Sequence, residues 1–249
     1  MTNLNAAPTL SLDGALFTLT QTSGRSYSLI RFHQHNAMVW GEYLGDASSP
    51  GRFVGRLTGD LLEMQFVHAE SESGQSGQLT YGRATALIDS SGKTVQLVSQ
   101  SPGAEDSTVT TVWAQSMATE ETAEAFDTAF GLASARHSGD NMIDDTEFVL
   151  LSSTASEVNH ESPSRFFFHE AAGIVWAEYE GDTVTFGYTV GFRVGNMLQE
   201  WFVHEVKATG ATLIGDSASQ IEMRADGQLE LKEDFVLDGV PGYSICVEV

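Results

Sequence analysis

Aromatic, acidic and imidazole side chains recur on short segments of this chain that have the composition of β-strands. Residues two positions apart on a strand share a face, so Trp176 pairs with Glu178 and Phe202 pairs with His204. An aromatic ring beside a carboxylate and an imidazole is the composition expected of a ligand pocket. Such groups could also exchange protons with a bound molecule near neutral pH. We therefore predict Glu178 and His204 as catalytic acid–base residues.

Related side chains complete the candidate site. We predict seven ligand-binding residues, which are Trp176, Tyr179, Tyr188, Phe202, Trp40, Glu42 and His68. A structural role is the alternative for each of them. Tryptophan and tyrosine on barrel strands usually pack in the core or at the rim, and a neighbouring Glu or His is usually solvated or satisfied by a backbone group.

A metal site is a weaker interpretation of the same region. His33 and His35 lie two apart, with Glu42 and His68 as further ligands. His-x-His also occurs in cupins, but the spacing to Glu42 differs from theirs and the second half of the chain has His169-Glu170-Ala171 at the corresponding place. We predict no bound metal and no cofactor.

Other catalytic patterns are absent from the sequence. It has no G-x-S-x-G elbow, no G-x-x-x-x-G-K phosphate loop and no G-x-G-x-x-G turn. The single cysteine, Cys246, lies in an apolar segment, which favours a buried thiol over a nucleophile. One cysteine also excludes an internal disulfide. Nucleotide-dependent and covalent hydrolase mechanisms are therefore not expected.

A duplication sets the architecture that must position these residues. The segment Val39-Trp40-Gly41-Glu42-Tyr43-Leu44-Gly45-Asp46 returns 136 positions later as Val175-Trp176-Ala177-Glu178-Tyr179-Glu180-Gly181-Asp182. The same offset carries Phe66-Val67-His68 to Phe202-Val203-His204. One structural unit has therefore been duplicated.

Each unit is a succession of short strands. In the first half the expected strands are 15–20, 28–32, 37–43, 61–67, 84–88 and 94–98, and in the second half they are 147–151, 165–168, 173–179, 183–192, 197–206, 211–214, 220–224, 229–237 and 243–248. Short strands without intervening amphipathic helices indicate antiparallel pairing. Short turns and strand glycines favour closure into barrels, and a sandwich is the competing closure.

One alanine-rich segment departs from the strand pattern. Residues 119–133 have a threonine cap, acids in the first turn and apolar residues at helical spacing. We therefore predict an all-β protein of two tandem antiparallel, calycin-like or lipocalin-like barrels. The predicted parts are a first barrel at 10–116, a helical linker at 117–145 and a second barrel at 146–249.

The second half resembles a family of small bacterial β-barrel proteins. The likeness rests on the W-x-E-Y-x-G strand at 176–181, the Phe-x-His strand at 202–204 and the D-G-x-L-x-L hairpin at 226–231. Members often carry the label N-acetylglutamate synthase, and this chain has no acetyltransferase motif, so we take no activity from that label. The resemblance implies a compact barrel of the calycin or avidin-like kind.

Charge and composition restrict the partners. The net charge of −22 opposes binding to nucleic acid or to anionic membranes, because affinity for phosphate backbones comes from Lys and Arg. The N-terminus has neither the basic start nor the apolar stretch of a signal peptide. We expect a cytoplasmic bacterial protein that does not span a membrane. We also expect the two repeats to pack on each other, and leave homo-oligomerisation open.

These features lead to a functional hypothesis with two alternatives. The leading one is binding of a small, mostly apolar organic molecule in a barrel cavity, with conversion by a cofactor-independent cyclase, isomerase or lyase reaction of the kind found in natural-product biosynthesis. The alternatives are a non-catalytic carrier and a structural or interaction protein with filled barrels. If one unit alone keeps a cavity, the second is the better candidate.

Overall fold

The computed structural model describes residues 11–20, 27–45, 50–69, 79–89, 94–100, 109–115, 120–135 and 141–249. The chain divides into two compact units, Met1–Ser138 and Gly139–Val249. Each unit contains one closed antiparallel barrel. The predicted all-β fold of two tandem barrels and one helix is therefore confirmed.

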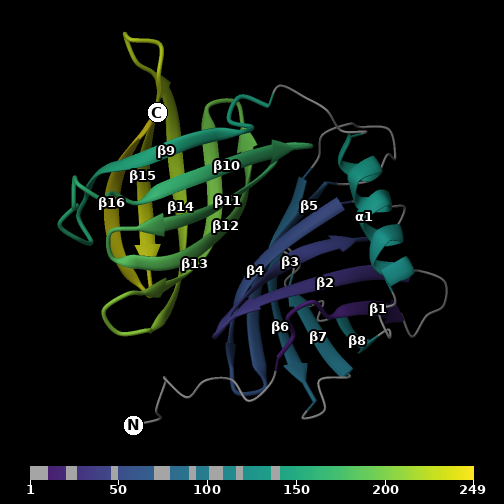
Figure 1. The fold of residues 1–249 in the computed structure, drawn as a ribbon. Coiled ribbons are helices and arrows are strands. Elements are labelled where there is room, and N and C mark those ends of the chain that lie inside the picture. The colour runs from purple at the N-terminus through teal and green to yellow at the C-terminus, as the bar shows by residue number, and fades with distance from the viewer. Residues whose placement is uncertain are drawn as a thin grey trace. The chain divides into compact units, whose positions relative to one another are not determined.

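The first barrel has eight strands, each paired with the next along the chain (Figure 1). They are β1 (Leu16–Thr20), β2 (Tyr27–His35), β3 (Met38–Leu44), β4 (Pro50–Thr58), β5 (Leu61–Ala69), β6 (Leu79–Ile88), β7 (Thr94–Gln100) and β8 (Val109–Gln115). Pairing of β1 with β8 closes the barrel.

The second barrel repeats this plan (Figure 1). Its strands are β9 (Thr146–Ser153), β10 (Arg165–Ala171), β11 (Ile174–Gly181), β12 (Val184–Val194), β13 (Met197–Val206), β14 (Thr212–Met223), β15 (Leu229–Leu237) and β16 (Val240–Glu248). Here β9 pairs with both β10 and β16 and closes the barrel.

Alternation along the strands separates an inner from an outer face. In β13, for example, Leu198, Glu200 and Phe202 follow one another at a spacing of two.

Tight turns join neighbouring strands, and residues with a positive φ make those turns. Between β10 and β11 these are Ala172 (φ 60°) and Gly173 (φ 74°), and Asn36 (φ 53°) has the corresponding position in the first barrel.

A cluster of phenylalanines fills the described core of the first barrel. Phe32 contacts Phe17 and Phe53 edge to face, with ring centroids 5.3 and 5.1 Å apart. All three side chains are fully buried. Edge-to-face packing is a favoured aromatic arrangement and stabilises the core beyond the area that it buries.

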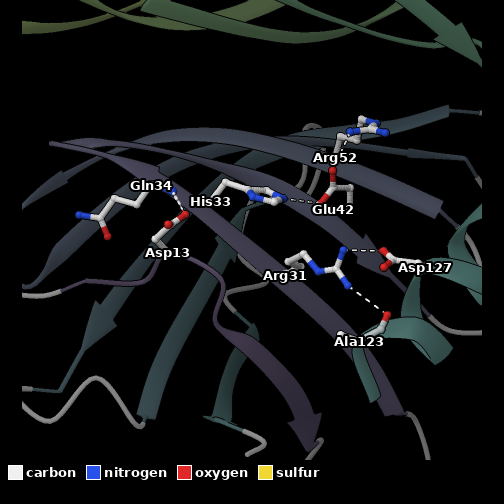
Figure 2. A network of polar contacts seen from close by, with 8 residues as sticks. All are labelled: Asp13, Arg31, His33, Gln34, Glu42, Arg52, Ala123 and Asp127. Carbon is white, nitrogen blue, oxygen red and sulfur yellow. Dashed lines mark hydrogen bonds and ion pairs between the residues drawn. The ribbon is translucent and has the colours of Figure 1, made fainter. Parts of the chain in front are cut away.

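The helix α1 (Glu120–Ala135) lies against the outer side of the first barrel (Figure 1). Phe126 and Ala133 of the helix form an apolar cluster with Leu16 and Leu44 that is separate from the barrel core. Arg31 of β2 donates hydrogen bonds to Asp127 Oδ1 at 2.5 Å and to the carbonyl oxygen of Ala123 at 3.2 Å (Figure 2). Apolar packing and hydrogen bonds from an arginine thus hold the helix to the sheet.

The segment before the first strand makes the same contacts in both barrels. The N–H of Leu12 donates to Oε1 of Gln34 at 2.7 Å, and the N–H of Ile143 donates to Oε2 of Glu170 at 3.3 Å. Leu12 and Ile143 are fully buried in their cores. Glu170 also forms an ion pair with Arg193 at 2.8 Å, whereas Gln34 is neutral and the position that matches Arg193 is Leu57.

The observed strands and the helix lie within the residue ranges predicted for the three parts of the chain. Strands β1–β8 lie within residues 10–116, α1 within 117–145 and β9–β16 within 146–249. Among the residues that the structure describes, no helix has the length and apolar character needed to cross a membrane.

Candidate functional site

The second barrel encloses a cavity of about 360 Å³. Its walls are mainly aromatic and aliphatic, and they include Leu150, Phe166, Phe168, Tyr179, Phe202, Leu231 and Phe235. The polar and ionisable side chains on the walls include Thr189, Glu200, His204, Ser219, Glu233, Ser244 and Cys246. A mostly apolar cavity of this size with a few polar groups is typical of a site for a small organic molecule.

Tyr179 and His204 form a buried pair on one wall of the cavity. The phenol oxygen of Tyr179 lies 2.9 Å from Nδ1 of His204 and shares a hydrogen bond with it. Phe202 stacks on the imidazole, with ring centroids 6.0 Å apart. Burial lowers the pKa of His204 to about 4, although the charge of Asp238 opposes this. The imidazole is therefore neutral at pH 7.

Glycines on the neighbouring strands make room for these rings. A Cβ atom at Gly187 would lie 2.2 Å from Cζ of Tyr179, and one at Gly215 would lie 2.4 Å from Cζ of Phe202. Both contacts are far shorter than van der Waals separation. The strand glycines thus position the aromatic walls of the cavity, besides any bending of the barrel.

Two carboxyl groups face the cavity from β13 and β15. Thr189 Oγ1 donates a hydrogen bond to Oε1 of Glu200 at 3.2 Å, and Ser244 Oγ donates to Oε2 of Glu233 at 2.5 Å. Burial and the charge of Glu233 together raise the pKa of Glu200 to about 8. Burial also raises the pKa of Glu233, and the hydrogen bond from Ser244 opposes that rise.

The structure divides the residues predicted for the second half into two groups. Tyr179, Phe202 and His204 line the cavity. Trp176, Glu178 and Tyr188 do not line it. Trp176 and Glu178 lie on the face of β11 opposite to Tyr179, where Trp176 stacks on His169 and Glu178 is exposed. Tyr188 is the cross-strand neighbour of Glu178 on that same face. Glu178 therefore cannot act together with His204, and the predicted acid–base pair is corrected here.

The residues predicted in the first half are divided in the same way. His68 lies on the inner face and shares a hydrogen bond of 2.9 Å with the phenol of Tyr43. Trp40 and Glu42 alternate with Tyr43 and lie on the outer face, where Trp40 stacks on His33. Glu42 is held between His33 and Arg52 at 3.2 and 3.1 Å (Figure 2).

The contacts of Glu42 with His33 and Arg52 lie on the outer face, next to helix α1. Burial alone would raise the pKa of Glu42, but the hydrogen bond with His33 and the positive charge of Arg52 lower it overall. The guanidinium of Arg52 also lies 5.3 Å from the ring centroid of Phe130 in α1. Glu42 thus lies beside the helix contact on the outside of the first barrel.

The histidines considered for a metal do not converge. His33 lies near Glu42 on the outer face, His35 is exposed beside Asn36, and His68 is bonded to Tyr43 inside the barrel. In the described part of the chain, the acidic and histidine side chains close enough to share an ion are Asp144, Asp145 and His169. Asp145 and His169 already contact each other at 3.1 Å.

A comparison of the two barrels separates what the fold needs from what is special to the second. The Tyr–His pair and the glycine beneath the tyrosine occur in both. At the positions of Thr189 and Glu200, the first barrel has the buried Phe53 and Met64. The polar cavity wall therefore belongs to the second barrel.

Sequence reasoning did not select several cavity residues, among them Glu200, Glu233, Thr189, Ser219 and Ser244. The period of two places Glu200 on the same face as Phe202 and His204, so the sequence does contain a signal for it. For Glu233 the signal is the alternation of Leu229, Leu231 and Glu233 on β15. The serines and Thr189 have no distinguishing pattern in the sequence.

Comparisons with known proteins agree with this architecture. A family model described as avidin-like protein matches residues 10–110 and 141–249, that is, both repeats. No curated protein matches the chain. The match gives no support to the N-acetylglutamate synthase label.

A solved structure that matches is a protein from Bacteroides fragilis that was provisionally assigned to the outer membrane. It is 9% identical, the match covers 95% of each chain, and the TM-score is 0.28. The cytoplasmic location predicted from the sequence is contradicted by that description and is not retained. No location is assigned in its place.

Proposed function

Because this chain belongs to the avidin-like protein family, we propose that its second barrel binds a small, mostly apolar organic molecule. The observation that carries the proposal is the cavity of about 360 Å³ inside that barrel. Pockets for small organic molecules begin at about 300 Å³ and are lined mainly by apolar and aromatic groups. A barrel filled by its own side chains, which was one alternative, does not fit this cavity.

The walls supply both affinity and orientation. Phe166, Phe168 and Phe202 offer apolar surface, and burial of a ligand's apolar surface against them is the main favourable contribution. The polar groups are few and already positioned by hydrogen bonds, as for Thr189 with Glu200 and Ser244 with Glu233. Such fixed groups orient a ligand with little loss of side-chain entropy.

Conversion of the ligand without a cofactor is a finer hypothesis for the same cavity. With Glu178 on the outer face, the carboxyl groups in reach of a bound molecule are those of Glu200 and Glu233. Glu200, whose pKa is about 8, would donate a proton, and Glu233, which ionises first, would accept one in its ionised form. A carrier and an enzyme therefore share one site, and binding is the property to test first.

We expect the variant Ser219→Leu to lose the binding of a neutral apolar probe, N-phenylnaphthylamine. Ser219 is buried on the cavity wall, so a leucine there would occupy the space of the probe. The dissociation constant, measured from the rise in probe fluorescence, should increase by about tenfold or more, because the filled volume corresponds to several methylene groups.

The matched control is Ala218→Leu. Ala218 is the preceding residue on β14 and is exposed on the opposite face. This variant should bind the probe as the parent protein does. Equal binding by all three proteins would place the probe outside the cavity and contradict the proposal, as would the absence of binding to the parent protein.

A further inference from the structure

The cavity of the second barrel contains two acids and no Lys or Arg to balance them. Glu200 and Glu233 both line it, from strands β13 and β15. Among its lining residues, all within the fully described range 141–249, none is Lys or Arg. Ionised carboxylates inside proteins are normally paired with a cation, so the missing positive charge points to the ligand.

The other ionisable groups around the two acids are neutral at pH 7. They are Tyr179 on β11, His204 on β13 and Cys246 on β16. Burial raises the pKa of Tyr179 and of the Cys246 thiol well above their usual values, and it lowers the pKa of His204 to about 4. None of the three neutralises a carboxylate.

The two acids differ in their surroundings. Glu233 accepts a hydrogen bond from Ser244, which stabilises its ionised form. Its negative charge in turn helps to keep Glu200 protonated, because two carboxylates close together in a buried site do not both ionise readily. As the pH rises, Glu233 therefore ionises before Glu200, and the cavity then holds one carboxylate and one carboxylic acid.

The first barrel indicates that the fold itself does not need these acids. The position that matches Glu200 is Met64. Ser219 pairs with Glu233, whereas the corresponding residue of the first barrel, Ala86, pairs with Leu97. The Tyr–His pair was kept in both repeats, but the acids occur in the second alone, which favours a role in ligand binding.

We propose that the ligand of the second barrel is a small apolar cation, such as an amine with an aromatic or branched aliphatic body, whose ammonium group lies beside the carboxyl groups of Glu233 and Glu200. This inference rests on the proposed function. The body of the amine would contact Phe166, Phe168 and Phe202. Aromatic rings near an ammonium group add cation–π attraction, which is stronger in a desolvated site.

The experiment compares three probes of similar shape and different charge by isothermal titration calorimetry at pH 7. They are naphthylethylamine, naphthylethanol and naphthylacetate. We expect the amine to bind about tenfold or more tightly than the alcohol, because a charge pair in a partly buried site is much stronger than one in water. The anion should not bind measurably, since its carboxylate would lie beside two acids with no Lys or Arg on the cavity walls.

Two isosteric variants isolate the charge. Glu233→Gln should bind the amine no more tightly than the alcohol, while its affinity for the alcohol stays near that of the parent protein. Asp234→Asn removes the same charge from the adjacent, exposed position of β15 and should keep the preference for the amine. Ser219→Leu should lose all binding, which excludes attachment of the amine to the acidic surface.

The pH dependence gives an independent measurement. Between pH 7 and 9 Glu200 loses its proton, because its pKa is about 8, while a primary alkylamine stays largely charged. The affinity for the amine should therefore rise over this range, and Glu200→Gln should abolish the rise. A fall in pH that protonates Glu233 should weaken binding.

The outcomes separate the two proposals. If none of the three probes binds, the proposed function fails. If the alcohol binds as tightly as the amine, or if Glu233→Gln leaves the preference unchanged, the cavity still binds apolar molecules and the inference about a cation is wrong. Binding of the amine that survives Ser219→Leu overturns the inference as well.

Discussion

The variant Arg193→Leu is expected to destabilise the second barrel by about 3–5 kcal/mol. Arg193 Nε donates to Oε1 of Glu170 at 2.8 Å, and the side chains are only 8% and 1% exposed. Without the guanidinium, the carboxylate of Glu170 stays buried, where the N–H of Ile143 donates to it at 3.3 Å. An uncompensated buried charge is among the most destabilising single changes in a protein.

A double variant tests this explanation by giving the second barrel the uncharged residue pair of the first barrel. The first barrel has Gln34 and Leu57 where the second has Glu170 and Arg193. Glu170→Gln combined with Arg193→Leu should therefore recover most of the lost stability. The Gln34 amide donates to the carbonyl oxygen of Asn36 at 2.8 Å, and Ala172 has the same left-handed conformation as Asn36. Its carbonyl oxygen is thus placed to accept from the new glutamine.

Native-state hydrogen exchange followed by mass spectrometry measures the effect in the full chain. Peptides from residues 141–249 report on the second barrel, and peptides from the first barrel serve as an internal reference. Exchange in the second barrel should quicken in the single variant and slow again in the double one. A double variant as unstable as the single one would mean that the loss arises from packing of the arginine stem and not from the unpaired carboxylate.

The duplication made the fold predictable to a large extent. An offset of 136 residues and a period of two along the strands were sufficient for two antiparallel barrels with a helix between them. Strand composition is a local property, so these elements could be recognised without knowledge of their partners. The order of the strands followed from their number and short connections.

Strand β8 was not predicted although its sequence, VTTVWAQ, has a strand composition, whereas β4 and β14 have compositions that hide them. The range Pro50–Thr58 of β4 contains a proline and two glycines, and β14 was predicted as two strands separated at residues 215–219. Gly215-Asp216-Ser217-Ala218-Ser219 has the composition of a loop. In the barrel Gly215 leaves room for Phe202, and Ser219 lines the cavity. The apparent loop is thus part of the site.

The candidate site could be predicted only in part, for a different physical reason. Alternation determines which residues share a face, but it does not determine which face is the inner one. On β11 both faces are largely buried, since Ile174 and Val175 alternate and are each at most 3% exposed. Trp176 and Glu178 were grouped correctly with each other and wrongly with Phe202 and His204. Tyr179, the opposite neighbour, lines the cavity.

The variant Gly187→Ala should destabilise the second barrel by about 2–4 kcal/mol and weaken binding of apolar probes. An added Cβ would lie 2.2–2.5 Å from three ring atoms of Tyr179, so the ring must move. Movement breaks the hydrogen bond of 2.9 Å to His204 and disturbs the stacking on Phe166, whose ring centroid is 4.8 Å away. Hydrogen exchange and N-phenylnaphthylamine fluorescence would measure the two effects.

Two further variants identify the cause of the loss. Gly131→Ala lies inside α1, where an added Cβ meets nothing within 4 Å, and it should not destabilise the protein. Tyr179→Leu combined with Gly187→Ala should be destabilised by clearly less than the sum of the two single changes, because the leucine removes the ring that the new methyl group contacts. Strictly additive effects would show that Gly187 is needed for the backbone of β12. A loss of stability smaller than that sum would show that Gly187 is needed to make room for Tyr179. The glycine, the ring and the cavity wall would then act as one unit.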